Sequence, residues 1–203
     1  FINQSKQKKH SPKGIQTKEK ILYEALMLFS KQGVQNTPFQ QVADAVGITQ
    51  AALYKYFSGR DELLRDAITF SAERSFSYFF HDKPENLNAK DELLHYIDKS
   101  LLWAKSEIPD NVAFMSVHYF SSQISIINKV QEEITNARLK RFKSFLDKGN
   151  DESLWNITNT TEKSLSIHNY ILGEMMAAFN STSKDYVTKN LERVCSTSLK
   201  LLK

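Results

Sequence analysis

Turn-forming residues are scarce in this chain, whose 203 residues include only four prolines and six glycines. Between these breaks, apolar side chains recur every three or four positions over most of the sequence. Such spacing lines apolar side chains along one face of an α-helix, whereas a half-buried β-strand would need strict alternation. We therefore predict an all-α protein.

The overall composition narrows the class of protein further. Hydrophobic residues make up 41% of the chain and charged residues 25%, which is ordinary for a globular protein. No run approaches the roughly 18 apolar residues of a membrane-spanning helix, and the start lacks the apolar core of a secretory signal. Cys195 is the single cysteine, which rules out an intrachain disulfide framework and a cysteine-cluster metal site. We expect a cytoplasmic protein without a membrane segment.

The net charge is concentrated in the first third of the chain. Residues 1–66 contain ten Lys or Arg and six Asp or Glu, a net charge of +4, whereas residues 67–203 contain seventeen of each. A basic N-terminal part, the head, joined to a neutral remainder, the body, indicates that the head binds a polyanion. Residues 1–14 are predicted to form a flexible basic arm that lies along phosphates or enters a minor groove, although a solvated tail would have the same composition.

The residues that follow this arm divide into short helices. We predict a first helix capped by Thr17 and ended by Gly33, over residues 17–32. Thr37 and Gln40 then have the spacing of a capping box, with a proline at the first helical position between them. A second short helix is therefore expected to begin there.

A glycine turn leads from this second helix to a third. Gly47 suits the sharp turn, and Thr49 can cap a brief helix in which Leu53 and Phe57 face the core. A long fourth helix follows over about residues 60–80. This order, a helix followed by a short helix, a glycine turn and another short helix, is that of a helix-turn-helix. In that motif the second short helix enters the major groove of DNA.

The remaining side chains of the third helix are then exposed, and their chemistry suits DNA. Gln50 can hydrogen-bond a base edge, Ala51 can touch a thymine methyl, and Lys55 can reach guanine or phosphate. Tyrosine hydroxyls and an arginine at the start of the fourth helix suit phosphate oxygens. Taken singly, such residues are more often plain surface or packing residues. The residues predicted to contact DNA are Thr37, Thr49, Gln50, Ala51, Tyr54, Lys55, Tyr56 and Arg60.

The combination of these residues is more specific than any of them alone. Residues 37–63 read TPFQQVADAVGITQAALYKYFSGRDEL. In spacing and residue type this stretch resembles the DNA-binding signature of the TetR family of transcription regulators, with Arg60 where lysine is usual and Ala51 where glycine is frequent. The resemblance covers about residues 15–66. It implies a body of further helices that binds an inducer and dimerises through its last two long helices.

The rest of the chain can supply such a helical bundle. We predict three parts: the basic arm (1–14), a helix-turn-helix domain (15–62), and a ligand-binding and dimerisation domain (63–203). The long fourth helix joins the three-helix head to the bundle. Further helices are expected at residues 89–107, 110–123, 124–148, 162–181 and 184–202, with a polar loop at 149–161.

The body is rich in aromatic side chains, which suits an apolar pocket with a few polar groups but equally an ordinary core. His118 and Glu174 are the polar residues expected to orient a ligand there. The predicted pocket residues are Tyr96, Trp103, Phe114, His118, Tyr119, Trp155, Tyr170 and Glu174. The predicted dimer interface consists of Ile171, Met175, Ala178, Val187, Leu191 and Val194.

The sequence gives little support to the hypothesis that this protein is an enzyme, because it has no glycine-rich phosphate loop, no nucleophile elbow and no two-histidine metal motif on a helix. We predict neither a metal nor another cofactor. The sequence favours a homodimeric, sequence-specific repressor that binds double-stranded operator DNA and is released by an unidentified small-molecule effector. The alternative is a DNA-binding regulator without small-molecule control, either architectural or controlled by a protein partner.

Overall fold

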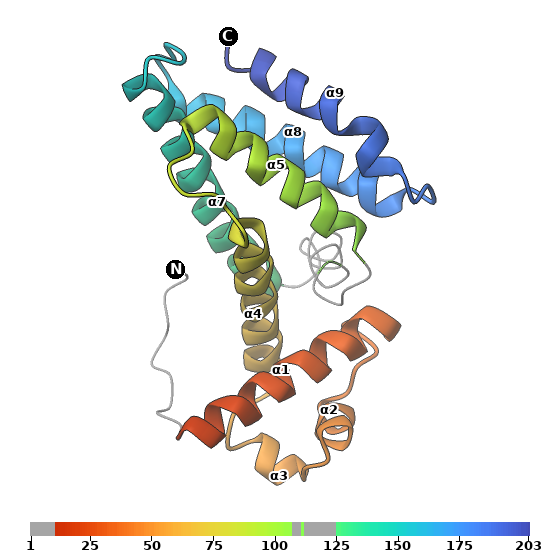
Figure 1. The fold of residues 1–203 in the computed structure, drawn as a ribbon. Coiled ribbons are helices and arrows are strands. Elements are labelled where there is room, and N and C mark those ends of the chain that lie inside the picture. Colours follow the sequence, from red (N-terminus) through yellow and green to blue (C-terminus); the bar gives the residue numbers. More distant parts are fainter. Residues whose placement is uncertain (1–10, 107–110, 112–124) are drawn as a thin grey trace. The chain divides into compact units, whose positions relative to one another are not determined.

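The fold is seen in a computed structural model that describes residues 11–106, 111 and 125–203 (Figure 1). All regular elements in these ranges are helices, as predicted. The chain divides into two compact units: the described residues up to 74 together with 125–134, and residues 75–106 together with 135–203. The boundary expected between residues 62 and 63 falls inside a continuous helix.

The first helix of the head, α1, runs from Pro12 to Gln32 and begins earlier than predicted. Ser11 is its N-cap and accepts a hydrogen bond from the Gly14 N–H at 3.3 Å. Thr17, predicted as the cap, lies inside the helix, where its hydroxyl donates to the Lys13 carbonyl at 2.9 Å. Residues 12–14 of the predicted arm are therefore helical, and residues 1–10 lie outside the described part of the chain.

The capping box predicted for the second helix is wrong. Helix α2 spans Phe39–Val46 with Pro38 as its N-cap and without a side-chain cap. The Thr37 hydroxyl donates instead to the carbonyl of Gly33 at 2.9 Å, and the Gln40 amide donates to Asp44 at 2.7 Å. Gly33 ends α1 at φ 82° and ψ 155°, a conformation essentially restricted to glycine.

The turn and the third helix agree with the prediction. Gly47 has left-handed backbone angles of φ 79° and ψ 34°, and the Thr49 hydroxyl caps α3 by accepting the Ala52 N–H at 3.1 Å. Helix α3 covers only Gln50–Leu53. Leu53 and Phe57 have no exposed surface, which confirms that both face the core.

Helix α4, Arg60–Phe80, begins close to the expected position, with Asp61 and Glu62 in its first turn. The core of the first unit is built from α1, α2, the residues around α3, the first part of α4 and the start of α7. It contains Ile21, Leu22, Ala25, Leu26, Phe29, Val34, Phe39, Val42, Ala43, Val46, Leu53, Phe57, Leu63, Leu64, Ala67, Ile68, Ile127, Val130 and Ile134.

The second unit contains the other long helices. They are α5 (Ala89–Lys105), most of α7 (Ser125–Asp151), α8 (Thr160–Asn180) and α9 (Tyr186–Lys200). Helix α5 packs against α8 and α9, and α8 packs against α9, so the three lie side by side (Figure 1). Their bounds agree with the predicted ranges to within a few residues, whereas the helix predicted at 110–123 lies almost wholly outside the described residues.

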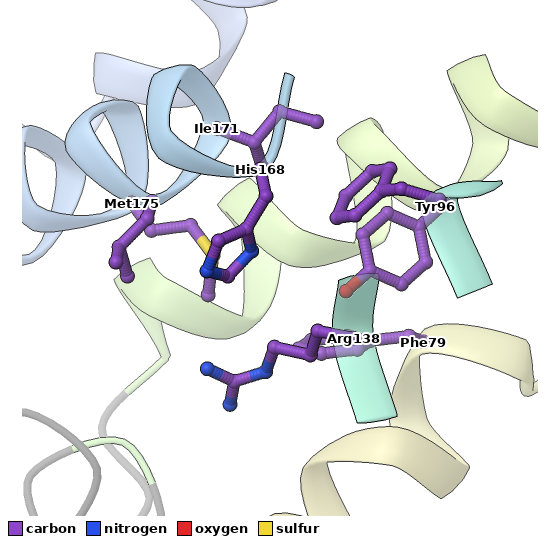
Figure 2. A pocket seen from close by; sticks show the side chains of 8 residues that line it. Phe79, Tyr96, Arg138, His168, Ile171 and Met175 are labelled. Carbon is purple, nitrogen blue, oxygen red and sulfur yellow. The ribbon is translucent and has the colours of Figure 1, made fainter. Parts of the chain in front are cut away.

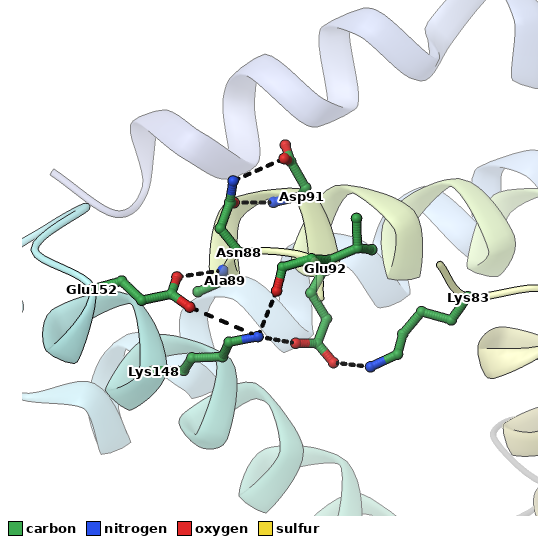
Figure 3. Close-up of polar contacts among 8 residues, drawn as sticks. Lys83, Asn88, Ala89, Asp91, Glu92, Lys148 and Glu152 are labelled. Atoms are coloured by element: carbon green, nitrogen blue, oxygen red, sulfur yellow. Dashed lines mark hydrogen bonds and ion pairs between the residues drawn. The ribbon is translucent and has the colours of Figure 1, made fainter. Parts of the chain in front are cut away.

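A polar network holds the start of α5 to the end of α7 (Figure 3). Glu92 accepts hydrogen bonds from Lys83 at 2.6 Å and from Lys148 at 2.9 Å. Glu152 accepts the Ala89 N–H at 2.6 Å and so satisfies a free donor at the start of α5. Burial of Glu92 acts to raise its carboxyl pKa, but the two lysines hold this pKa below its ordinary value.

None of the helices in the described ranges is both long enough and apolar enough to span a membrane.

The Trp155 side chain packs against the last turns of α7, directly over Gly149. Its indole N–H donates to the Leu146 carbonyl at 2.8 Å. A Cβ atom built on Gly149 would lie 1.9 Å from Cζ2 of the indole. Any larger residue at position 149 must therefore displace Trp155.

We predict that Gly149→Ala lowers the free energy of unfolding by about 1–3 kcal/mol, the usual cost of overpacking. In the Trp155→Ala background the same change should cost nothing, because alanine favours a helix over glycine by about 0.5–1 kcal/mol. Urea unfolding of the four proteins in this double-mutant cycle measures the coupling. Equal effects of Gly149→Ala in both backgrounds would show that the indole does not require the glycine.

Candidate functional site

The exposed face of α3 is set by the two residues that anchor it. Leu53 and Phe57 are fully buried, so Thr49, Ala51, Tyr54 and Lys55 are left exposed. The surface carries a hydroxyl, a methyl, a phenol and an ammonium group. This mixture suits base edges and phosphates.

Tyr54 and Gln50 are the larger side chains of this face. The Tyr54 ring packs on Phe39 of α2 with ring centroids 4.9 Å apart, yet the residue stays 49% exposed. Gln50 is half-buried. The packing on Phe39 restricts the movement of Tyr54 without covering it.

Three other residues predicted to contact DNA have roles inside the head. Thr37 is 2% exposed, and its hydroxyl is bonded to Gly33, so this side chain has little surface to offer a phosphate. Tyr56 is half-buried and packs against the core of the first unit. Arg60 is exposed, but its guanidinium donates to the Val34 carbonyl and ties the start of α4 to the segment after α1.

Part of the positive charge of the head is neutralised within it. Lys18 forms an ion pair with Asp66 at 2.8 Å, and the Lys20 ammonium donates to the carbonyl of Val46, the last residue of α2, at 3.3 Å. Asp66 is already counted in the net charge of +4, so these contacts leave that total unchanged and fix only where the lysine charges lie.

A narrow cavity lies inside the second unit, with room for about one water-sized molecule. Its lining comes from α4, α5, α7 and α8 and is mainly apolar. Three polar groups face it: the Tyr96 hydroxyl, the Arg138 guanidinium and the His168 imidazole (Figure 2). The complete lining is Phe79, Tyr96, Arg138, Phe142, His168, Ile171, Leu172 and Met175. We call this space the Tyr96 cavity.

Burial alters the titration of two of these groups. It raises the pKa of the Tyr96 hydroxyl, which therefore stays protonated and can donate a hydrogen bond. It lowers the pKa of the Arg138 guanidinium, because a low-dielectric surround disfavours its charge. The two side chains lie close enough for the arginine charge to act on the phenol.

Of the predicted pocket residues, Tyr96 lines the cavity. Trp103 is buried beside it and packs edge-on against Phe79, with ring centroids 5.6 Å apart. Trp155 bonds to Leu146 at the end of α7 instead. The remaining members of the prediction either pair with α9 (Tyr170 and Glu174) or lie outside the described residues (Phe114, His118 and Tyr119).

The sequence reasoning missed Arg138, Phe142 and His168. His168 lies one turn from Ser164 and from Ile171 on the buried face of α8, so the helical periodicity already placed it inside. Arg138 gave no such signal, because an arginine on a long amphipathic helix usually extends to solvent.

The residues predicted for the dimer interface are mostly interior residues of a single chain. Only Leu191 is half-buried. The five that are buried within the second unit, and so present little surface to a partner, are Ile171, Met175, Ala178, Val187 and Val194. Apolar periodicity shows which face of a helix is buried but does not show against what.

Glu174, expected as a ligand-orienting residue, forms the main polar link between α8 and α9. Its two carboxylate oxygens accept hydrogen bonds from the Arg193 guanidinium, each at 2.8 Å, and Tyr186 donates to it at 3.3 Å. These bonds, with that from Arg193 as the largest effect, hold the carboxyl pKa of Glu174 below its ordinary value.

Comparison with known proteins agrees with this architecture. Residues 21–67 match the model of a family described as bacterial regulatory proteins, tetR family. That range contains the second half of α1, all of α2 and α3, and the start of α4. This part of the chain is therefore similar to the TetR family, over residues 21–67 of the 203.

The chain is also similar to proteins described as transcription regulators. The regulator AcrR of Shigella flexneri is 23% identical over 125 residues, which is 59% of this chain and 57% of AcrR. The biofilm operon negative transcriptional regulator IcaR of Staphylococcus epidermidis is 32% identical over 62 residues, 30% of this chain and 31% of IcaR. The matches thus span less than two thirds of either relative.

Solved structures share the fold over nearly the whole chain. A putative transcriptional regulator from Saccharomonospora viridis in complex with choline has a TM-score of 0.74 at 14% identity, over 90% of this chain and 95% of that one. AibR in complex with isovaleryl coenzyme A and operator DNA has a TM-score of 0.64 at 15% identity, over 92% and 97%. Among the described residues, no group of His, Cys, Asp or Glu could hold a metal ion.

We predict that Glu174→Gln lowers the free energy of unfolding at pH 7 by about 0.5–1.5 kcal/mol, because the charge-assisted bond to the half-exposed Arg193 is lost. A depressed carboxyl pKa stabilises the fold above the unfolded value of about 4.3, and this contribution disappears as the pH falls through the folded value. The difference between wild type and variant should therefore shrink below about pH 4.3.

Denaturant unfolding at a series of pH values measures this difference. The matched control is Lys189→Gln, which removes a more exposed ion pair of α9, the one with Asp185 at 3.7 Å, and should have little effect. A difference for Glu174→Gln that is constant with pH would show that the carboxylate charge is not what stabilises this contact.

Proposed function

We propose that this protein is a homodimeric repressor of the cytoplasm that reads operator DNA through α3 and leaves it when a small molecule occupies the Tyr96 cavity. The observation that carries the proposal is the geometry of α3. Its anchors are fully buried, and its remaining side chains are exposed directly after a left-handed glycine turn. A short helix held in this way is the reading element of a helix-turn-helix.

Base recognition is assigned to Gln50 and Ala51, which begin α3. The amide of Gln50 can both donate to and accept from an adenine edge, and the methyl of Ala51 fits against a thymine methyl. Thr49, Tyr54 and Lys55 supply contacts that orient the head on the phosphate backbone. Arg60 can add to these with the donors that Val34 leaves unused.

Two heads must act together, because one head reads only one half-site of about five base pairs on a helical repeat of roughly 34 Å. We place the contact between subunits on the exposed face of α8 rather than on its buried stripe. Leu165 is 46% exposed there, and Asn169, Gly173 and Ala177 are exposed as well. A Cβ atom on Gly173 would meet nothing within 4 Å, so the helix has no covering of its own at that point.

Effector control is supported by the cavity and by what related structures hold. The Saccharomonospora viridis protein was solved with choline, and AibR with isovaleryl coenzyme A and operator DNA. A ligand that favours the DNA-incompetent state by about 1–3 kcal/mol would weaken operator binding by about 5- to 150-fold.

The second candidate is a regulator whose DNA binding no small molecule controls. The observation that favours it is the narrowness of the Tyr96 cavity. Selection of operator sequences from a random library, followed by gel-shift assays with small-molecule collections, separates the two. Release of the operator by some compounds supports an effector-controlled repressor, and a complex that all of them leave intact supports the second candidate.

We predict that Gln50→Ala relaxes base preference at one position of each half-site by about 1–3 kcal/mol. The selected sequences should become degenerate at that position alone. Gln35→Ala, which removes the same amide from the exposed segment between α1 and α2, is the matched control and should leave the selected sequence unchanged. An unaltered sequence preference in Gln50→Ala would transfer base reading to other residues of α3.

We predict that Gly173→Glu separates the subunits, because it places a charge where α8 is expected to meet its partner. The chain itself should fold normally, since the new side chain enters open space. Sedimentation at micromolar concentration should show a 23.4 kDa species instead of a dimer, with operator affinity lost although α3 is intact. Asn136→Glu, on an exposed position of α7, is the control that should stay dimeric.

A dimeric Gly173→Glu protein would place the interface on another face. A monomeric wild type with full operator affinity would end the dimer proposal altogether.

A further inference from the structure

The Tyr54 side chain combines a free hydroxyl with a ring that is held in place. Within the described part of the chain its hydroxyl has no hydrogen-bond partner, and the residue is 49% exposed. Tyr186 of α9 uses its hydroxyl inside the protein instead, by donating to Glu174 at 3.3 Å. The Tyr54 hydroxyl is therefore available to a molecule that binds the head from outside.

Two contacts from different helices hold Tyr54. Its backbone N–H donates to the Gln50 carbonyl at 3.0 Å, which places it at the end of α3. Its ring lies against Phe39, the first residue of α2, with ring centroids 4.9 Å apart and ring planes tilted by 46°. This separation lies in the range of favourable aromatic pairs. The backbone contact fixes where the side chain begins, and the ring contact limits the directions in which the hydroxyl can point.

Phe39 can serve as a fixed support because the start of α2 is tied to α1. Phe39 is 9% exposed and belongs to the core of the head. The Thr37 hydroxyl, two residues earlier, donates to the Gly33 carbonyl at 2.9 Å, and the Gln32 amide of α1 donates to Gln41 at 2.7 Å. These bonds hold the chain on both sides of Phe39, so its ring has little freedom to follow a movement of Tyr54.

We propose that Phe39 is a positioning residue for DNA binding, which holds the Tyr54 hydroxyl toward a backbone phosphate before the DNA arrives. This inference rests on the function proposed above. Immobilising a flexible side chain during binding lowers the affinity, and a side chain that is fixed beforehand avoids much of that loss. A phenol hydroxyl can donate to a phosphate oxygen whatever the base sequence is. Phe39 therefore sets the strength of the operator complex but not its sequence preference.

A double-mutant cycle on the full chain tests this coupling, with gel-shift assays on operator sequences that the wild type selects. Phe39→Leu keeps an apolar side chain in the core but removes the ring, and it should weaken binding by about 2- to 10-fold for each head that contacts DNA. Tyr54→Phe keeps the ring contact but removes the hydroxyl, and it should weaken binding as well. In the Tyr54→Phe background Phe39→Leu should have little further effect, because no hydroxyl remains to be positioned.

Two further readouts separate positioning from a general loss of structure. Selection from a random library should return the wild-type sequence for Phe39→Leu, whereas a displaced α3 would change the base preference. Phe29→Leu removes the same ring from the α1 part of the same core and should leave operator affinity nearly unchanged. If thermal unfolding shows that Phe39→Leu does not fold, Phe39→Met takes its place in the cycle.

Equal weakening by Phe39→Leu with and without the Tyr54 hydroxyl would overturn the proposal, and so would a Tyr54→Phe protein that binds as the wild type does. In both cases the wild type still selects an operator, so the proposed function stands. A wild type that selects no DNA sequence would instead refute the proposed function, and this inference with it.

Discussion

Helix α3 is four residues long and could not exist by itself, because isolated helices shorter than about 12 residues are marginal in water. Its form depends on the burial of Leu53 and Phe57, which have no exposed surface and lie four residues apart. The Thr49 cap and the left-handed angles at Gly47 direct the chain into that position. Which side chains face outward is therefore decided by the core of the head, so a core substitution can alter DNA recognition without touching a contact residue.

The core of the second unit combines aromatic rings with aliphatic side chains. Tyr96 meets Phe79 and Phe142 edge-on, with centroids 5.2 Å apart in both cases. The Tyr96 cavity lies beside these rings, and two of its polar side chains, Tyr96 and His168, also belong to the buried core. Binding and packing thus use the same side chains, and a substitution made to probe one also perturbs the other.

Local sequence rules predicted much of the head, but they misplaced the start of α1 and misread Thr37. The glycine turn, the Thr49 cap and the inward pair Leu53 and Phe57 follow from spacing over a few residues. Thr37 was misread because its hydroxyl can either cap the next helix or bond back to the preceding turn. In the structure it donates to the carbonyl of Gly33. In the second unit the same rules identified the helices but not what each helix packs against. Ile171 and Val194 face the interior of their own unit, and periodicity cannot distinguish such residues from those of a dimer interface. Arg138 faces a cavity, and periodicity cannot distinguish it from an arginine on a solvated face.

Two helices, α4 and α7, contribute residues to both compact units. Helix α7 carries Ile134 in the core of the head and Arg138 in the cavity lining, only one turn later. Helix α4 likewise carries Ile68 in the head core and Phe79 in the lining. A ligand in the Tyr96 cavity, as proposed above, would therefore contact two helices that also carry residues of the head core.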